Sequence, residues 1–147
     1  MNDDALTPPD ALHEVLGFHI RLAHGAVYRH FSETFANLGL TQKQVSVMWL
    51  IEAFPQIAQT DLAERLQMDR ATTMAIVNRL QSRELLTRGK SQTDKRKQIL
   101  TLTATGRETL ANAKLAIAQH ESWLNARFTD EERETLRSLL MRIHQGE

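Results

Sequence analysis

Apolar residues recur at helical spacing along most of the chain, in segments that begin at cap residues and end at turn residues. The first segment follows a cap at Asp10 and extends to about Asn37. Thr41 opens a second segment, which Pro55 stops because proline breaks a helix. This pattern predicts two consecutive helices before residue 56.

Two shorter helices and a pair of strands are predicted next. Residues 59–68 and 70–83 have helical spacing, with Asp69 as the cap of the second segment and a turn of about three residues between them. Residues 85–88 and 98–103 are typical of strands, and the polar stretch 89–97 between them predicts a hairpin tip. A helix-turn-helix followed directly by a hairpin is a winged helix, which places its second helix in the major groove of DNA.

The chain is predicted to end in two helices. Residues 104–128 form a long helical segment, and Thr129 with Glu132 forms a capping box before a last helix that has a narrow apolar stripe. The expected fold class is therefore mainly α with a small β-hairpin wing (α+β). Its architecture would be a winged helix-turn-helix within a single domain of residues 1–147.

Composition narrows the classes of function. The 147 residues contain no cysteine, which excludes disulfides, thiolate metal sites and thiol redox chemistry. The apolar runs are shorter than a membrane span and the N-terminus is acidic, so we expect a cytoplasmic protein without a membrane partner. The sequence has no Gly-rich phosphate loop and no nucleophile elbow, so we expect neither an enzyme nor a cofactor.

Charge is distributed unevenly, although 18 basic residues balance 18 acidic ones. Residues 1–40 have a net charge of −3, residues 41–103 of +4 and residues 104–147 of −1. Lys95, Arg96 and Lys97 are adjacent at the expected hairpin tip. Charge alone favours a solvated surface over a polyanion site. The position of these charges on a winged helix favours double-stranded DNA as the partner.

Three stretches carry a resemblance to the MarR family of bacterial transcriptional regulators. They read LTQKQ, LAERLQMDRATTMAIVNRLQSRELLTR and DKRKQILTLTATG, and all lie in residues 40–106. The most specific part is Asp94-x-Arg96 followed by Leu102-Thr103-x-x-Gly106. The resemblance implies a regulator, most often a repressor, that binds a small-molecule effector and a pseudo-palindromic DNA operator.

The resemblance also implies a homodimer whose first and last helices intertwine. Residues 10–38 and 104–147 would form the helical dimerisation region, and residues 41–103 the DNA-binding region. The contacts between subunits would come from residues 12–35 together with Trp123, Phe128, Leu136, Leu139, Leu140 and Ile143.

The outward face of the helix at 70–83 is predicted to read the major groove, with Arg70, Ala71, Thr72, Ala75, Asn78, Arg79 and Arg83 as the DNA-binding candidates. The methyl groups of Ala71 and Ala75 suit the thymine methyl, and Asn78 suits adenine. Thr72 can bond a base or a phosphate, whereas the arginines suit phosphates. The alternative is that Asn78 and Arg79 only face solvent.

In the wing, Arg96 matches the arginine that enters the minor groove in the family. Asp94 is expected to orient it, by accepting hydrogen bonds from the wing backbone or by pairing with an arginine. Lys90, Lys95 and Lys97 are expected to attract phosphates.

Two positions depart from the family pattern. Glu84 stands where members usually have glycine, so the helix before it is expected to end differently and to change the orientation of the wing. Ala75 stands where several relatives have arginine, and alanine cannot make a bidentate contact to guanine.

The sequence offers three effector-binding candidates. His19 and His30 fall within the apolar stripe of the first helix, where imidazoles need partners, and Trp49 could form an aromatic wall. They suit an anionic or phenolic effector, and the alternative is that both histidines are structural. Two further alternatives are a winged helix that binds protein, and a metal-responsive regulator that uses histidines. No metal site is expected, because His13, His19, His24 and His30 lack the i,i+3 or i,i+4 spacing of shared ligands.

Overall fold

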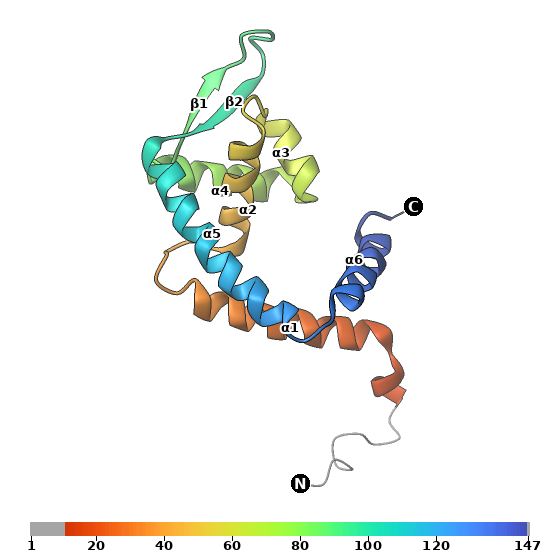
Figure 1. The fold of residues 1–147 in the computed structure, drawn as a ribbon. Helices are drawn as coiled ribbons and strands as arrows, with labels where there is room; N and C mark the ends of the chain where they lie inside the picture. Colours follow the sequence, from red (N-terminus) through yellow and green to blue (C-terminus); the bar gives the residue numbers. More distant parts are fainter. Residues whose placement is uncertain (1–10, 147) are drawn as a thin grey trace. The chain divides into compact units, whose positions relative to one another are not determined.

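The structure is a computed structural model that describes residues 11–146, so the predicted cap at Asp10 lies outside the described residues. Along the chain, a short 3-10 helix comes first, followed by four α-helices, a two-stranded hairpin and two further α-helices (Figure 1). The described residues form two compact units. The first unit contains residues 11–34 and 120–146, and the second is Phe35–Gln119.

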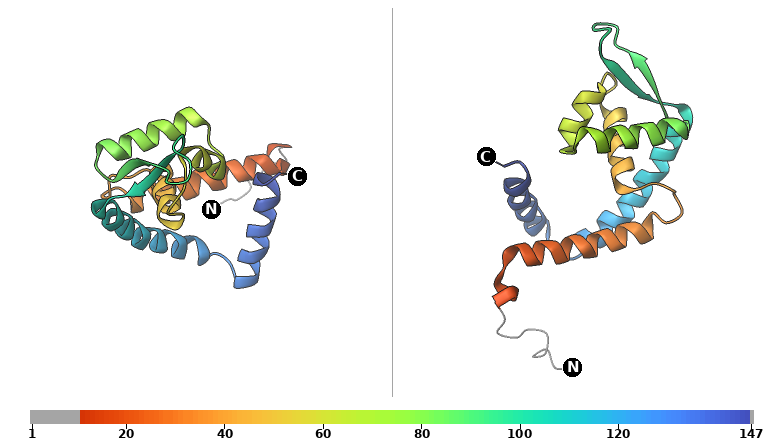
Figure 2. Two further views of the ribbon diagram at one scale, coloured as in Figure 1. Left: turned by 90° about the horizontal axis from the view of Figure 1, so that it is seen from above. Right: turned by 180° about the vertical axis from the view of Figure 1, so that it is seen from behind.

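The second unit begins with three helices, α2 (Gln42–Ala53), α3 (Gln59–Leu66) and α4 (Arg70–Ser82), grouped at the base of the hairpin (Figures 1 and 2). The capping box predicted at Thr41 is present: its hydroxyl accepts from Gln44 N at 3.1 Å, and the Gln44 side chain accepts from Thr41 N at 3.0 Å. Residues 67–69 form the turn between α3 and α4, which confirms the helix-turn-helix.

The hairpin pairs β1 (Leu86–Lys90) with β2 (Gln98–Leu102) in antiparallel register, with Leu86 opposite Leu102. An isolated bridge between Ala58 and Ile99 joins the segment before α3 to the other edge of β2. This bridge fixes the hairpin to the start of the helix-turn-helix. The predicted winged helix is therefore present, with the tip of the wing at residues 91–97.

The core of the second unit lies between the three helices, the hairpin and the first part of α5 (Ala104–Asn125). Its largest fully buried side chains are apolar apart from one threonine: Val47, Met48, Leu62, Thr73, Val77, Leu80, Leu86, Leu100 and Leu110. Each buried leucine stabilises the fold by roughly 1.5–3 kcal/mol relative to exposure. The buried residues of α3 and α4 recur at helical spacing, as the apolar pattern of residues 59–68 and 70–83 predicts.

The end of α4 differs from the expectation based on Glu84. Glu84 adopts the left-handed conformation, with φ of 61°, that a glycine would adopt here. Its N–H donates to Gln81 O at 2.9 Å, and Leu85 N donates to Leu80 O at 3.0 Å. These two bonds are the Schellman motif, so the helix ends as it would with glycine, at the cost of backbone strain of about 1 kcal/mol.

Thr103 connects this helix end to the strand and to the start of α5. Its hydroxyl donates to Glu84 O at 2.7 Å and accepts from Gly106 N at 2.9 Å, and its own N–H donates to Leu85 O at 3.1 Å. Gly106 lies so close to Leu85 that an added Cβ would be 1.9 Å from the Leu85 carbonyl oxygen. We call Glu84, Leu85, Thr103 and Gly106 the junction.

The first unit contains a short 3-10 helix (Ala11–Glu14), α1 (Leu16–Thr34), the end of α5 and α6 (Asp130–His144). The predicted single helix from residue 10 to residue 37 is therefore wrong at both ends. It starts with tighter 3-10 geometry, and Leu38 N bonds Phe35 O in a turn after α1. Similarly, α5 ends at Asn125 instead of residue 128, because residues 126–128 turn before the capping box of Thr129 and Glu132.

Helix α6 has no buried residue. The exposed large apolar side chains of the first unit are Leu12, Val15, Leu16, Ile20, Leu22, Tyr28, Leu136, Leu139, Leu140, Met141 and Ile143. An exposed apolar set of this size, spread over the 3-10 helix, α1 and α6, is typical of a protein–protein interface.

Candidate nucleic-acid interface

Helix α4 presents most of the predicted DNA-binding residues to solvent. Arg70, Ala71, Ala75, Asn78 and Arg79 are all exposed. The helix begins at Asp69, whose carboxylate accepts from Thr72 N and from the Thr72 hydroxyl, both at 2.7 Å. These two bonds from Thr72 hold the pKa of Asp69 below its ordinary value.

The capping bond changes what Thr72 offers. Its hydroxyl proton is directed at Asp69, so only the oxygen lone pairs remain for a ligand. Arg83 also has an intramolecular partner, since its Nη1 donates to Gly39 O at 2.7 Å. The phosphate contact predicted for Arg83 would have to use its remaining donors.

The wing tip is organised around Ser91 and Asp94. The buried hydroxyl of Ser91 accepts from Thr93 N at 3.2 Å and Asp94 N at 3.1 Å. Asp94 Oδ1 accepts from Arg96 N at 3.1 Å and from Arg96 Nε at 3.3 Å. The Arg96 side chain is nevertheless 91 % exposed, so its guanidinium is held at one edge and free at the other.

Lys90, Lys95 and Lys97 are exposed around the same tip. Among the described residues, none of these three lysines forms an ion pair. The tip therefore presents three unpaired ammonium groups beside Arg96, an arrangement suited to phosphate oxygens.

Sequence reasoning missed Arg88 of β1 and its partners Gln59 and Gln81, although it names Asn78, the third partner. Its guanidinium donates to Gln59 Oε1 at 3.1 Å, to Asn78 Oδ1 at 2.6 Å and to the side-chain oxygen of Gln81. Met74 Sδ lies 3.5 Å from Arg88 Nη2. A signal was available, since strand alternation places Arg88 on the same face as the buried Leu86.

The chain matches the model of the MarR family over residues 38–97. It is 33% identical over 130 residues to a proposed transcriptional regulatory protein for the hcr operon of Thauera aromatica, across 88% of this chain and 78% of that protein. The chain belongs to the MarR family. The MarR-family assignment agrees with the resemblance in residues 40–106 and makes the protein a transcriptional regulator.

Two solved structures of the repressor CouR are similar to this MarR-family protein over nearly their whole length. One is CouR bound to a 23-mer DNA duplex, with 35% identity and a TM-score of 0.87 over 94% of this chain and 98% of that one. The other is CouR bound to p-coumaroyl-CoA, with 35% identity and a TM-score of 0.84 over 92% and 96%. The predicted fold class is thereby confirmed.

The histidines predicted for an effector site each have a partner in this MarR-family protein. His19 is exposed, and its Nε2 lies 2.5 Å from His13 O. His30 Nδ1 lies 2.8 Å from Nδ1 of His120, and the His30 ring stacks on Trp123 with centroids 4.0 Å apart. Both histidines therefore have the hydrogen-bond or stacking partners that a structural role requires.

His120 is the most buried of these imidazoles, with 6 % of its surface exposed. Burial lowers its pKa, the nearby His30 lowers it further, and Glu121 opposes both effects. Trp123, which stacks on His30, is also covered by Arg127, with the guanidinium carbon 4.1 Å from the Trp123 ring centroid.

Trp49 belongs to the second unit and is 39 % exposed. Lys114 Nζ lies 4.7 Å from its ring centroid and also pairs with Glu52. An ammonium over an indole ring gives Trp49 a partly cationic environment.

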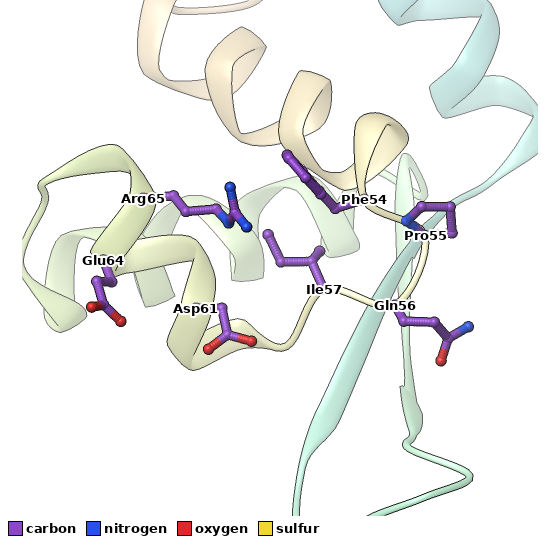
Figure 3. A pocket seen from close by; sticks show the side chains of 7 residues that line it. All are labelled: Phe54, Pro55, Gln56, Ile57, Asp61, Glu64 and Arg65. Atoms are coloured by element: carbon purple, nitrogen blue, oxygen red, sulfur yellow. The ribbon is translucent and has the colours of Figure 1, made fainter.

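An open groove of about 730 Å³ lies where α2 leads into α3 (Figure 3). It is lined by Phe54, Pro55, Gln56, Ile57, Asp61, Glu64 and Arg65. Arg65 points toward Phe54, with its guanidinium carbon 4.0 Å from the ring centroid. The lining contains two carboxylates and only one guanidinium, which already covers a ring, so the groove does not suit an anionic effector. None of the predicted effector residues lines it.

Within residues 11–146, no three histidine or acidic side chains are grouped closely enough to hold a metal ion. Over the same residues, none of the helices is long and apolar enough to span a membrane.

Proposed function

We propose that this MarR-family regulator is a sequence-specific, double-stranded DNA-binding repressor that acts as a homodimer and is released by a small aromatic effector. The observation that carries the proposal is the combination of an exposed recognition helix with a basic wing tip in one compact unit. Arg96 is the central residue, since Asp94 fixes its backbone and one side of its guanidinium while the rest remains free.

The proposed roles in DNA binding follow the grooves. Helix α4 would enter the major groove through Ala71, Thr72 and Ala75, while Arg96 would enter the minor groove. Arg70, Arg79, Lys90, Lys95 and Lys97 would hold phosphates. CouR, which is similar over 94% of this chain, is a repressor whose structure was solved on a DNA duplex, and this supports the proposal.

The proposed effector class is an aromatic or phenolic anion, including aromatic acyl thioesters of coenzyme A. Support comes from the similar CouR that binds p-coumaroyl-CoA. Trp49 offers an aromatic surface for such a ligand, and the Lys114 ammonium over its ring is held there by its ion pair with Glu52. His19, His30 and Trp49 stay the candidate contacts.

DNA binding is tested by fluorescence anisotropy on the duplex immediately upstream of the protein's own gene, with a scrambled duplex as competitor at near-physiological salt. We expect nanomolar affinity for the upstream duplex and a preference of about a thousandfold over the scramble. Equal, weak binding to both duplexes would contradict the proposal and favour a winged helix that binds protein.

Two wing variants test the role of Arg96 in the same assay. Arg96→Ala should weaken binding by about tenfold or more without lowering the melting temperature, because its side chain is exposed and packs against nothing. Lys97→Ala is the matched control, with a small loss and a salt slope lower by about one. Equal affinities for Arg96→Ala and the wild type would remove Arg96 from the interface.

Effector release is tested on the same complex with p-coumaroyl-CoA, free p-coumarate and coenzyme A alone. Release by the thioester but not by coenzyme A would support an aromatic acyl group as the signal. Retention of DNA with all three would contradict this effector class and leave DNA binding unaffected.

A further inference from the structure

One guanidinium connects three elements at the base of the wing. Arg88 lies on β1, and its partners lie at the start of α3 (Gln59) and on one face of α4 (Asn78 and Gln81). All three partners are side-chain amides. Among the described residues, no carboxylate pairs with Arg88.

The chemistry of guanidinium fixes the orientation of these amides. Arginine has five N–H donors and no acceptor, so each amide must turn its oxygen toward Arg88 and its NH₂ group away. The Gln59 nitrogen then donates to Met74 Sδ at 3.1 Å. The NH₂ groups of Asn78 and Gln81 donate to no group within residues 11–146, and both residues are exposed.

This orientation changes which base Asn78 can read. Recognition of adenine by asparagine is bidentate, with the oxygen accepting from N6 and the nitrogen donating to N7. The oxygen of Asn78 is already engaged by Arg88 at 2.6 Å. One lone pair of that oxygen is therefore occupied, while the NH₂ group is fully available and can bond an acceptor such as adenine N7, guanine O6 or N7 or thymine O4.

We propose that Arg88 is a specificity-determining residue that acts through Asn78 and Gln81. It holds both amides as hydrogen-bond donors on the outward face of α4, so that this part of the helix selects a base that presents an acceptor (adenine, guanine or thymine) and disfavours cytosine, which presents only a donor. This inference rests on the proposed DNA-binding function and extends the contact predicted for Asn78 from the sequence.

The arrangement also lowers the cost of binding. A free asparagine or glutamine side chain loses rotamer freedom when it contacts a base, and this loss opposes binding. Arg88 restrains the two amides before DNA arrives. The same cation, without a carboxylate partner in the described chain, adds attraction for the phosphate backbone.

The test compares Arg88→Lys, Arg88→Met, Asn78→Ala and the double variant Arg88→Lys/Asn78→Ala with the wild type. Arg65→Lys is the matched control, since Arg65 is an arginine of the same unit outside the proposed interface. Each protein is titrated against a panel of operator duplexes that carry every single base-pair substitution, at several salt concentrations. Melting temperatures establish that each variant is folded.

Lysine keeps the charge but cannot hold three amide oxygens in a planar fork. We therefore expect Arg88→Lys to leave the salt slope unchanged and to reduce discrimination about fivefold or more at the base pair where Asn78→Ala also reduces it. The wild type should disfavour cytosine there. The double variant should lose no more discrimination than Asn78→Ala alone, and Arg65→Lys should lose none.

Three outcomes would overturn the inference. Arg88→Lys could keep full discrimination at the Asn78 position, or the wild type could prefer cytosine there. Alternatively, Arg88→Met could lower the salt slope by about one while all base preferences persist, which would make Arg88 a phosphate contact only. A wild type without any base preference would overturn the proposed function as well, and that result is distinct from the other three.

A second measurement does not depend on DNA. The side-chain NH₂ resonances of Asn78 and Gln81 in the free protein should shift in Arg88→Lys and stay in place in Arg65→Lys. Unchanged resonances in Arg88→Lys would show that Arg88 does not orient the two amides.

Discussion

The two units of this protein use apolar residues in opposite ways. In Phe35–Gln119, the apolar faces of α2, α3 and α4 are covered by one another and by the hairpin, with side chains such as Met48, Leu62 and Leu80 fully buried. In the other unit, α6 has no buried residue although Leu136, Leu139, Leu140 and Ile143 share one face. The unit of residues 35–119 has a complete core of its own, whereas the apolar face of α6 in the other unit is left exposed.

The difference shows what a hydrophobic stripe means. Periodicity identifies the face of a helix that avoids water, but it does not say whether the same chain or another chain covers that face. MarR regulators are homodimers, so a second copy is the natural partner for the apolar face of α6. Four changes test the contrast between a covered and an uncovered face, and they follow in order of expected size.

Leu140→Glu should have the largest effect. A carboxylate at the centre of a subunit interface would have no partner, and an unpaired buried charge costs about 3–5 kcal/mol. We expect monomers at micromolar concentration in analytical ultracentrifugation, and loss of operator binding. Ser138→Glu, an exposed change on the same helix, is the control and should remain dimeric. Dimers of Leu140→Glu would mean that a different face forms the interface.

Gly106→Ala should destabilise the core of the unit Phe35–Gln119. The new Cβ would lie 1.9 Å from the Leu85 carbonyl oxygen, which is backbone and cannot rotate away. We expect a loss of about 3 kcal/mol in the free energy of unfolding, measured by urea denaturation. Gly17→Ala in α1 is the comparison, because nothing lies within 4 Å of its Cβ position. It should not destabilise the protein, and equal losses for both would contradict the close packing at the junction.

Glu84→Gly should raise stability. Glu84 has φ of 61°, a conformation that costs a non-glycine residue about 1 kcal/mol and costs glycine little. The free energy of unfolding should increase by up to about 1 kcal/mol, less the entropy that glycine adds to the unfolded chain. Gln67 has a similar φ of 54° at the end of α3, so Gln67→Gly should behave alike. A decrease for both variants would show that their side chains stabilise these helix ends.

His120→Gln should have the smallest effect, confined to acidic pH. Burial and His30 lower the folded-state pKa of His120 below its ordinary value of 6.5, so the unfolded chain binds more protons as the pH falls below that value. The wild type should therefore lose stability from about pH 6.5 downward, whereas above it this contribution is absent. His120→Gln should lose less over the same range, as measured by melting temperature. His24→Gln, at an exposed position, should follow the wild type, and parallel curves for all three proteins would exclude His120 as the cause.

Much of the fold could be predicted because its signals are local. The caps at Thr41, Asp69 and Thr129 mark the helix starts, and the hairpin follows from two strand-like stretches with a polar tip. The ends of the helices were harder to predict from the sequence, because Glu84 adopts a left-handed conformation that a non-glycine residue disfavours. The local bonds from Glu84 N to Gln81 O and from Leu85 N to Leu80 O hold this conformation, together with the tertiary bond from the Thr103 hydroxyl to Glu84 O.

The candidate site was harder to predict than the fold. Exposed residues such as Arg96 follow from motif and charge, and Asp94 lies two residues away. Arg88 depends on partners 7 to 29 residues distant, and no local pattern indicates them. For the same reason, the sequence suggested partners for His30 in general but not His120, which is 90 residues away.

The junction has a kinematic consequence. Because Thr103 bonds both Glu84 and Leu85 while Gly106 packs on the same carbonyl, the end of α4, the end of β2 and the start of α5 share few independent degrees of freedom. Arg88 adds a second point of attachment between the wing and α4. With two attachments, the wing cannot swing against the recognition helix as a hinge would allow. In a homodimer, the two DNA-binding units would adapt to a change in half-site spacing only if each unit, with its wing and α4 together, moved as a rigid body.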